Sequence, residues 1–144
     1  MRYYISLSAG GMSYEAISEN ISAITSALEQ RGDEAVSSFT RATPEAVAGQ
    51  ALTDEDFARL MEVEFRDIDT CQALIALVQN RHVGRGQRME VPYGIAKGLP
   101  TIGARHEAGN TLWRPFVCSE LVYRTAPELG QLILAMPSPF RSPE

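Results

Sequence analysis

A glutamate just behind a glycine-rich segment has the setting that most suggests chemistry in this sequence. Residues 83–90 have the sequence VGRGQRME, which places Glu90 shortly after Gly84 and Gly86. We expect a helix over about residues 88–97 with Glu90 in its first turn, where the helix dipole favours an ionised carboxylate. Such a carboxylate is a candidate nucleophile. Composition alone favours the plainer interpretation, an ordinary first-turn glutamate.

A second carboxyl group, that of Glu64, interrupts an apolar helical face. Thr53 begins a capping-box pattern, and we expect a helix from there to about residue 71. Its apolar stripe consists of Phe57, Leu60, Met61, Ile68 and Cys71. A carboxyl group on that stripe is desolvated or faces a cavity, and a desolvated carboxyl holds its proton, as a proton donor requires. A glutamate at the rim of the stripe that reaches solvent is the equal alternative, and Asp67 and Asp69 compete for the role.

Two loops supply groups that could contact a small ligand. Residues 6–11 have the sequence SLSAGG, whose hydroxyls and free amides suit a hydroxylated or anionic group. This loop lacks the glycine signatures of dinucleotide and triphosphate sites. The substrate contacts that we expect from both loops are Ser6, Ser8, Gly10, Gly84, Gly86 and Arg88.

The histidines and cysteines fit no metal or nucleophile pattern. His82 and His106 lie in polar segments and are expected to be solvated, and Cys71 and Cys118 lie in apolar segments as expected of buried free thiols. Trp113 is expected to pack in a core or interface more readily than to stack on a base. We expect neither a metal nor a cofactor.

Strand and helix patterns alternate along the chain. Strands are expected at 3–7, 35–39, 73–78 and 99–103, and the unbroken apolar run ALIALV at 73–78 is typical of a central parallel strand. Helices are expected from the cap Ser13 to Gly32, at 53–71 and at 88–97, with helical pieces at 119–123 and 129–136. The polar residues that follow the second strand, through Gln50, are a candidate lid. This order predicts an α/β, Rossmann-like (flavodoxin-like) parallel sheet of four to five strands flanked by helices.

Ligands of open parallel sheets bind beyond the carboxyl ends of the strands, where the strand order reverses. We therefore expect the loops at 8–13, 79–87 and 104–113 to converge on one site.

Composition restricts the partners and the number of domains. The 144 residues are 44% hydrophobic and 22% charged, which suits one domain over 1–136 followed by a loose tail over 137–144. With 13 basic and 18 acidic residues and no basic cluster, nucleic acid polymers and membranes are poor partners. No signal sequence or long apolar run is recognised, so we expect a cytoplasmic protein that binds a small molecule.

The same segments resemble the nucleoside 2-deoxyribosyltransferase family and its relatives, the 2'-deoxynucleoside 5'-phosphate N-hydrolases and CMP hydrolases. The family segment G-x-G-x-E-L-G-x-A corresponds to residues 86–100, GQRMEVPYGIAKGLP, with Glu90 in the nucleophile's place. Counting back eight residues from Gln72, as the family spacing of its catalytic aspartate implies, gives Glu64. Tyr4 and Ser8 correspond to residues around the sugar.

The resemblance implies cleavage of the N-glycosidic bond of a nucleoside or nucleoside 5'-monophosphate, by hydrolysis or by base transfer, in a homodimer or higher homo-oligomer. Glu90 would attack the anomeric carbon, and Glu64, or failing it Asp67, would protonate the base. Arg88 and Pro92 depart from the family pattern and favour the alternative, a non-catalytic nucleotide-binding or sensor module. The apolar segment at 121–136 either forms a subunit contact or covers the sheet.

Overall fold

The computed structural model describes residues 1–8, 10–37, 39 and 53–140, which form one parallel sheet flanked by helices. The strands are β1 (Arg2–Leu7), β2 (Glu34–Ser37), β3 (Ala73–Val78), β4 (Thr101–His106) and β5 (Ser119–Tyr123). The helices are α1 (Tyr14–Gln30), α3 (Asp54–Asp69), α4 (Arg85–Ala96), α5 (Ala126–Ala135) and the short 3-10 helix η2 (Arg114–Phe116). All five strands are parallel in the order β2-β1-β3-β4-β5, which confirms the predicted flavodoxin-like fold.

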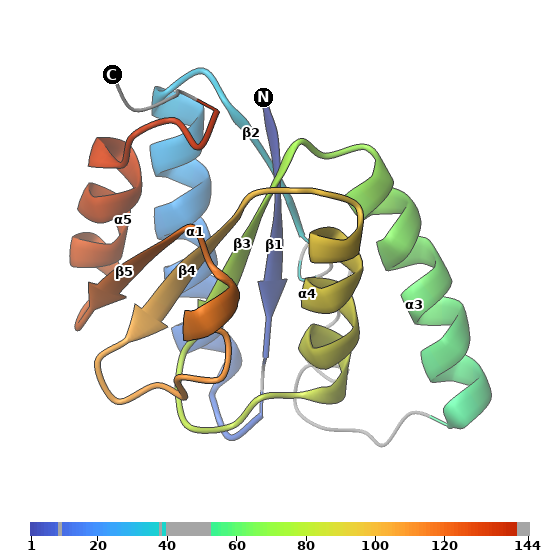
Figure 1. The fold of residues 1–144 in the computed structure, drawn as a ribbon. Helices are drawn as coiled ribbons and strands as arrows, with labels where there is room; N and C mark the ends of the chain where they lie inside the picture. The colour runs from blue at the N-terminus through green and yellow to red at the C-terminus, as the bar shows by residue number, and fades with distance from the viewer. Residues whose placement is uncertain (9, 38, 40–52, 141–144) are drawn as a thin grey trace.

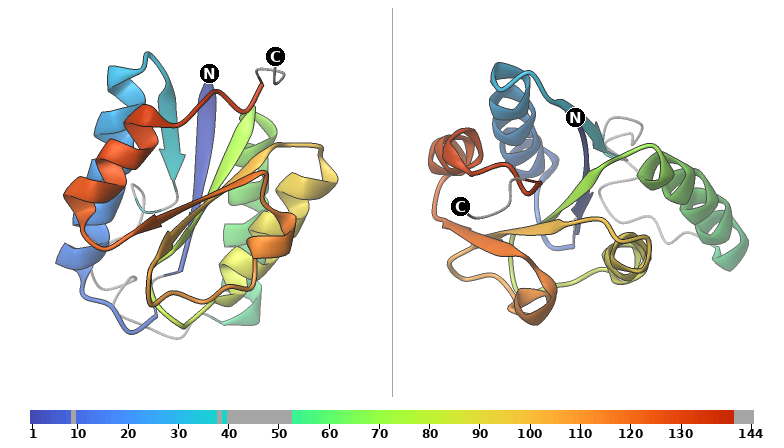
Figure 2. Two further views of the ribbon diagram at one scale, coloured as in Figure 1. Left: turned by 60° about the vertical axis from the view of Figure 1, so that its left-hand side comes forward. Right: turned by 45° about the horizontal axis from the view of Figure 1, so that its top comes forward.

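Helices cover both faces of this sheet (Figure 1). α1 and α5 lie on one face and α3 and α4 on the other, as the views in Figure 2 also show. The strands point toward the lower edge of the sheet in Figure 1, so the loops that follow β1, β3 and β4 lie together there. The order reverses between β1 and β3, which makes the carboxyl ends of these two strands the expected place for a ligand.

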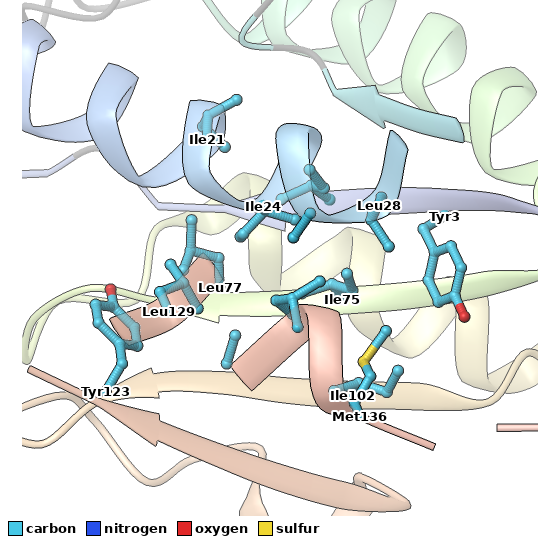
Figure 3. Packing of buried hydrophobic residues seen from close by; sticks show 14 of the residues in the cluster. Tyr3, Ile21, Ile24, Leu28, Ile75, Leu77, Ile102, Tyr123, Leu129 and Met136 are labelled. Atoms are coloured by element: carbon cyan, nitrogen blue, oxygen red, sulfur yellow. The ribbon is translucent and has the colours of Figure 1, made fainter. Parts of the chain in front are cut away.

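Successive side chains of β1 serve opposite faces of the sheet, because the side-chain period of a strand is two. Tyr3 and Ile5 belong to the core beneath α1 and α5, where Ile75 packs with them (Figure 3). Tyr4 faces α3 and α4 and is fully buried with Leu74 of β3. The even-numbered side chains of β1 are thereby directed toward the helices that carry the candidate carboxylates.

The helix ends follow the local signals in the sequence. The hydroxyls of Ser13 and Thr53 accept hydrogen bonds from Ala16 N and Asp56 N, both at 3.1 Å, so both predicted caps are confirmed. Gly32 follows α1 with φ of 81°, in the left-handed region that glycine tolerates best.

Three expectations are wrong. Residues 119–123 form β5, which pairs in parallel with β4, and not a helical piece. The thiol of Cys118 is exposed, whereas that of Cys71 is buried as expected. Helix α4 begins at Arg85, because Gly84 caps it in an extended conformation, and therefore starts ahead of the predicted residue 88.

Of three other expectations, one is largely confirmed, one lies outside the described residues and one stays a prediction. The helical prediction for 129–136 is largely confirmed by α5, whose Leu129 and Ile133 are fully buried against the sheet. The candidate lid, which ends at Gln50, lies within residues 40–52, outside the described residues. The boundary at 136 stays a prediction, and Met136 is itself buried in the core beneath α5.

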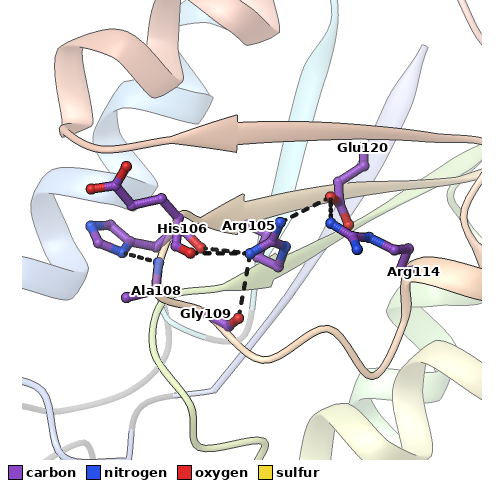
Figure 4. A network of polar contacts seen from close by, with 7 residues as sticks. Arg105, His106, Ala108, Gly109, Arg114 and Glu120 are labelled. Atoms are coloured by element: carbon purple, nitrogen blue, oxygen red, sulfur yellow. Dashed lines mark hydrogen bonds and ion pairs between the residues drawn. The ribbon is translucent and has the colours of Figure 1, made fainter.

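An ion-pair cluster fixes the segment between β4 and β5 (Figure 4). The Glu120 carboxylate of β5 pairs with Arg105 of β4 and Arg114 of η2, each at 3.1 Å. Arg105 also donates to backbone carbonyls of the loop that follows β4, including that of Gly109 at 3.5 Å. This cluster holds the loop that carries Trp113 against the sheet.

Candidate active site

Glu90 is buried between α4 and β1, with two hydroxyl groups directed at its carboxylate. Its side chain is 3% exposed. The Tyr4 hydroxyl donates to Oε2 at 2.5 Å, and the Ser6 hydroxyl donates to Oε1 at 2.8 Å. Both donors come from the even-numbered positions of β1. The sequence placed these three residues in one site, and the structure brings them into direct contact.

Close packing of α4 on the sheet makes these contacts possible. A Cβ at Gly94 would lie 2.6 Å from Cδ1 of Leu74 in β3, so any larger residue would force the Leu74 side chain or the helix to shift. Val91, next to Glu90, is fully buried on the same side. The Glu90 carboxyl group is therefore held by a tightly packed helix.

Glu64 is the second buried carboxyl group of the site. It lies on α3, is 5% exposed, and hydrogen-bonds through its side chain with Glu90. Of the two alternatives for Glu64, the buried one is confirmed and the solvent-reaching one is wrong, since Met61 and Ile68 on the same face are also buried. Two carboxyl groups from different helices thus form one pair.

Burial raises the pKa of Glu90 to about 9, and the hydrogen bond and charge of Glu64 act in the same direction. The hydrogen bonds from Tyr4 and Ser6 favour the ionised form but are outweighed. At neutral pH the pair therefore keeps one proton that an isolated glutamate would have lost, and it titrates as a unit.

The prediction that the helix dipole favours the ionised form of the Glu90 carboxyl group is wrong. Because α4 begins at Arg85, its first turn contains no acidic residue and Glu90 lies beyond it. The dipole effect is confined to the terminal turn. Desolvation controls the ionisation of this carboxyl group, and the direction of its effect is opposite to the one expected.

The predicted loops converge at the carboxyl ends of the strands. The Ser8 hydroxyl accepts from Gly84 N at 2.9 Å, which joins the loop after β1 to the start of α4. The carbonyl of Gly10 accepts from Asn80 Nδ2 at 2.8 Å. Asn110 N donates to the carbonyl of Asn80 at 2.9 Å and adds the third loop.

The other predicted substrate contacts lie at this edge without touching the carboxyl pair. Gly86 is in the first turn of α4, and a Cβ there would meet no atom within 4 Å. Arg88 is exposed, and its Nε donates to the carbonyl of Val83 at 3.1 Å. Residues two apart on a helix point about 200° apart, so Arg88 and Pro92 face away from Glu90.

The competing acids occupy different surroundings. Asp69 lies at the carboxyl end of α3, where it pairs with Lys97 at 2.9 Å and accepts from the Tyr93 hydroxyl at 2.7 Å. Because α3 runs opposite to the strands, this pair lies at the other edge of the sheet (Figure 1). Asp67 is half-buried one turn beyond Glu64. Of the three candidates, Glu64 is the one whose side chain bonds to Glu90.

Two buried glutamines were not identified from the sequence. Gln79 donates to the carbonyl of Ser8 at 2.9 Å and accepts from Asn20 of α1 at 2.7 Å. Gln87 is fully buried and accepts from Trp113 Nε1 at 3.2 Å. Trp113 thus packs in the core, as expected. Glutamine in a glycine-rich segment gives no sequence signal for burial.

The two histidines have different surroundings. His82 is exposed and lies against Gly10, while His106 packs edge-on to Tyr123. Among the residues that the structure describes, no cluster of three or more His, Cys, Asp or Glu side chains could hold a metal ion. No helix within that same part of the chain is long and apolar enough to span a membrane.

Comparisons with known proteins identify the fold. No family model and no curated protein matches the sequence. The structure is similar to a 2-deoxyribosyltransferase of Bacillus psychrosaccharolyticus, with a TM-score of 0.68 and 12% identity over 95% of this chain and 93% of that chain. It is also similar to a CMP N-glycosidase of Clostridium botulinum, with a TM-score of 0.59 and 16% identity over 91% and 96% of the two chains.

Proposed function

We propose that this protein cleaves the N-glycosidic bond of a nucleoside or nucleoside 5'-monophosphate, with Glu90 as nucleophile and Glu64 as the acid that protonates the departing base. The observation that carries the proposal is the buried, hydrogen-bonded Glu64–Glu90 pair at the switch point of the sheet. Perturbed carboxyl pairs of this kind cluster at functional sites. The fold shared with a CMP N-glycosidase and a 2-deoxyribosyltransferase supports this choice of reaction.

The first step starts from the form of the pair in which the shared proton lies on Glu64 and Glu90 is ionised. An oxygen of Glu90 attacks the anomeric carbon and forms a glycosyl ester as the carbon–nitrogen bond breaks. The electron pair of that bond remains on the base nitrogen, and the base leaves with the proton of the pair, delivered by Glu64. Tyr4 and Ser6 orient the attacking carboxylate, since both hydroxyls donate to it.

The second step reverses the first with a different nucleophile. Water, or a second base, attacks the anomeric carbon and displaces Glu90, and its proton returns to the pair. The proximity of the two carboxyl groups, through which Glu64 raises the pKa of Glu90, supports this two-step route. A single displacement needs water between carboxyl groups separated by roughly 6.5–9.5 Å.

The surroundings of the pair suit a small polar substrate. We propose that Ser8, Gly10 and Gly84 line the approach to Glu90 from the loop side. In support, Gly84 N donates to the Ser8 hydroxyl, and the Gly10 carbonyl accepts from Asn80 Nδ2 of the loop after β3. Gly86 leaves open space at the start of α4, and the amino end of a helix favours an anionic group.

A substrate screen with matched variants tests the proposal. The protein is incubated with nucleosides and 5'-monophosphates, with and without an acceptor base, and free or exchanged base is measured by chromatography. Glu90→Ala and Glu90→Gln should abolish product, whereas Asp69→Asn, which alters an exposed carboxylate at the far edge, should retain the wild-type rate. Undiminished turnover by both Glu90 variants contradicts the assignment.

The same screen separates the catalytic proposal from a non-catalytic nucleotide-binding or sensor module. Ligand binding measured by calorimetry, without turnover and unchanged in Glu90→Gln, would favour the sensor. The exposure of Arg88 and Pro92 on the side of α4 away from Glu90 supports the catalytic proposal, because neither side chain blocks the nucleophile.

We also propose a cytoplasmic homodimer or higher homo-oligomer. Leu129 and Ile133 of the apolar C-terminal segment cover the sheet, so the contact would need other residues. Leu60 and Val63 of α3 and Met89 of α4 are about two-fifths exposed, at 39%, 41% and 42%. Sedimentation equilibrium gives the mass directly, and a monomer at micromolar concentration would contradict this proposal.

A further inference from the structure

Gln87 joins three parts of the chain through a side chain that has no solvent exposure. Its Nε2 donates to the carbonyl of Ser6 at 3.0 Å and to the carbonyl of Leu77 at 2.9 Å. Its Oε1 accepts from Trp113 Nε1 at 3.2 Å. The side chain therefore links the carboxyl ends of β1 and β3 to the loop before η2.

The hydrogen bonds define the orientation of the Gln87 amide. The two donors of the amide meet two carbonyl oxygens, and its oxygen meets the indole N–H, which can only donate. The reverse orientation would place the amide oxygen against both carbonyls and the amide nitrogen against the indole. A single orientation is thus satisfied, and the network is complete in the buried interior.

Ser6 is held by α4 from two directions. Gln87 binds its backbone carbonyl, and Glu90, one turn later on α4, binds its hydroxyl at 2.8 Å. The peptide group and the side chain of Ser6 are therefore positioned by the same helix that carries the candidate nucleophile. Trp113 supports this arrangement through Gln87.

We propose that Gln87 is a positioning residue that fixes the end of β1 so that the Ser6 hydroxyl donates to Glu90. Loss of the Gln87 amide would free the Ser6 carbonyl and the Leu77 carbonyl from their shared donor, and the hydroxyl of Ser6 would lose its fixed direction. Glu90 would then be less well oriented and its charged form less stabilised. The catalytic consequence rests on the proposed function, whereas the positioning does not.

The positioning is tested without a substrate, by carbon-13 NMR of glutamate side-chain carboxyls during a pH titration. Gln87→Met keeps the length of the side chain and removes its hydrogen bonds. The hydrogen bond of Ser6 lowers the pKa of Glu90, so weakening it should raise the apparent pKa of the Glu64–Glu90 pair. We expect a shift of about one unit, as for a lost hydrogen bond to a charged group.

Gln79→Met is the matched control, because Gln79 is also a buried glutamine at this edge but binds Ser8 and Asn20 and not Ser6. It should be destabilised to a similar degree without moving the titration of the pair. Trp113→Phe removes only the indole N–H that donates to Oε1 of Gln87, so it should raise the apparent pKa of the pair by a smaller amount. This variant tests the inference if Gln87→Met does not fold. An unmoved titration in a folded Gln87 or Trp113 variant, or equal shifts in the Gln79 control, would overturn the inference.

Turnover provides a separate readout once a substrate is known. Gln87→Met should lower kcat with little change in KM, because the positioning acts on Glu90 and not on the substrate. Absence of any substrate would defeat the proposed function but leave the NMR result intact. A normal kcat in Gln87→Met beside an inactive Glu90→Gln would defeat only the inference.

Discussion

The raised pKa of Glu90 makes the stability of the protein depend on pH in a direction opposite to that of most carboxylates. The folded protein holds a proton on this pair up to a pKa of about 9, whereas an unfolded glutamate loses it near 4.5. The native state therefore binds more protons than the unfolded state within that window, and stability decreases as pH rises through it. The contribution is present below the unfolded pKa and is lost as the pH approaches 9.

Glu90→Gln removes this dependence, because glutamine resembles the protonated carboxyl group and cannot ionise. Each pH unit inside the window lowers the wild-type free energy of unfolding by at most about 1.4 kcal/mol. Between pH 6 and pH 8 the wild type should thus lose up to roughly 3 kcal/mol relative to the variant. Small domains have about 5–15 kcal/mol of stability in total, so the difference is large enough to measure.

Urea unfolding at pH 6, 7 and 8 measures the effect. The slopes of free energy against urea concentration should agree among variants, which isolates the change in stability. Asp69→Asn serves as the control: the hydrogen bonds from Tyr93 and Lys97 lower the pKa of Asp69, so this group stays ionised over the whole range. Parallel pH dependences of wild type and Glu90→Gln would refute the reasoning.

Three further predictions concern the same site. Glu64→Gln should reduce kcat by about 10²–10⁴-fold for bases that need protonation and by less for bases that leave as stable anions, in steady-state assays of both kinds of substrate. Tyr4→Phe should raise the apparent pKa of the carboxyl pair in an NMR titration, because it removes the 2.5 Å hydrogen bond to Glu90. Tyr3→Phe is the control and should leave that titration unchanged, because the Tyr3 hydroxyl has no hydrogen-bond partner among the described residues. Gly94→Ala should lower the free energy of unfolding by about 1–3 kcal/mol, because its Cβ would meet a β3 side chain at 2.6 Å. Gly86→Ala, with open space around it, should leave the free energy of unfolding unchanged. Urea unfolding measures both variants.

The sequence was most informative where a pattern repeats over many residues. The unbroken apolar run of β3 and the helical periodicity of α1 and α3 predicted these elements, and the periodicity of α3 made a buried Glu64 one of two equal alternatives. In β5, by contrast, Leu121 and Val122 are only half-buried or exposed, so this edge strand lacks both an unbroken apolar run and clear alternation. Residues 119–123 are recognised as a strand by their parallel pairing with β4.

The sequence predicted which residues of the candidate site lie together but not the ionisation of its carboxyl groups. Glu90 and Glu64 followed from the resemblance together with helical spacing, whereas their hydrogen bond depends on how closely α3 and α4 pack. The two glycines at the start of α4 disfavour a helix locally, which concealed its true beginning at Arg85. Gln87 could not be identified because its partners lie on two strands and a distant loop.

The order in which the chain is made has a consequence for the carboxyl pair. The hydrogen bonds from Tyr4 and Ser6 to Glu90 span 86 and 84 residues of sequence. During synthesis β1 emerges first, yet the hydroxyls of Tyr4 and Ser6 cannot reach Glu90 until α4 has been made. Contacts of such long range form late in folding, because loop closure must be completed before they can form. A partly synthesised chain therefore has no assembled carboxyl pair, and the pair arises only when the centre of the sheet is complete.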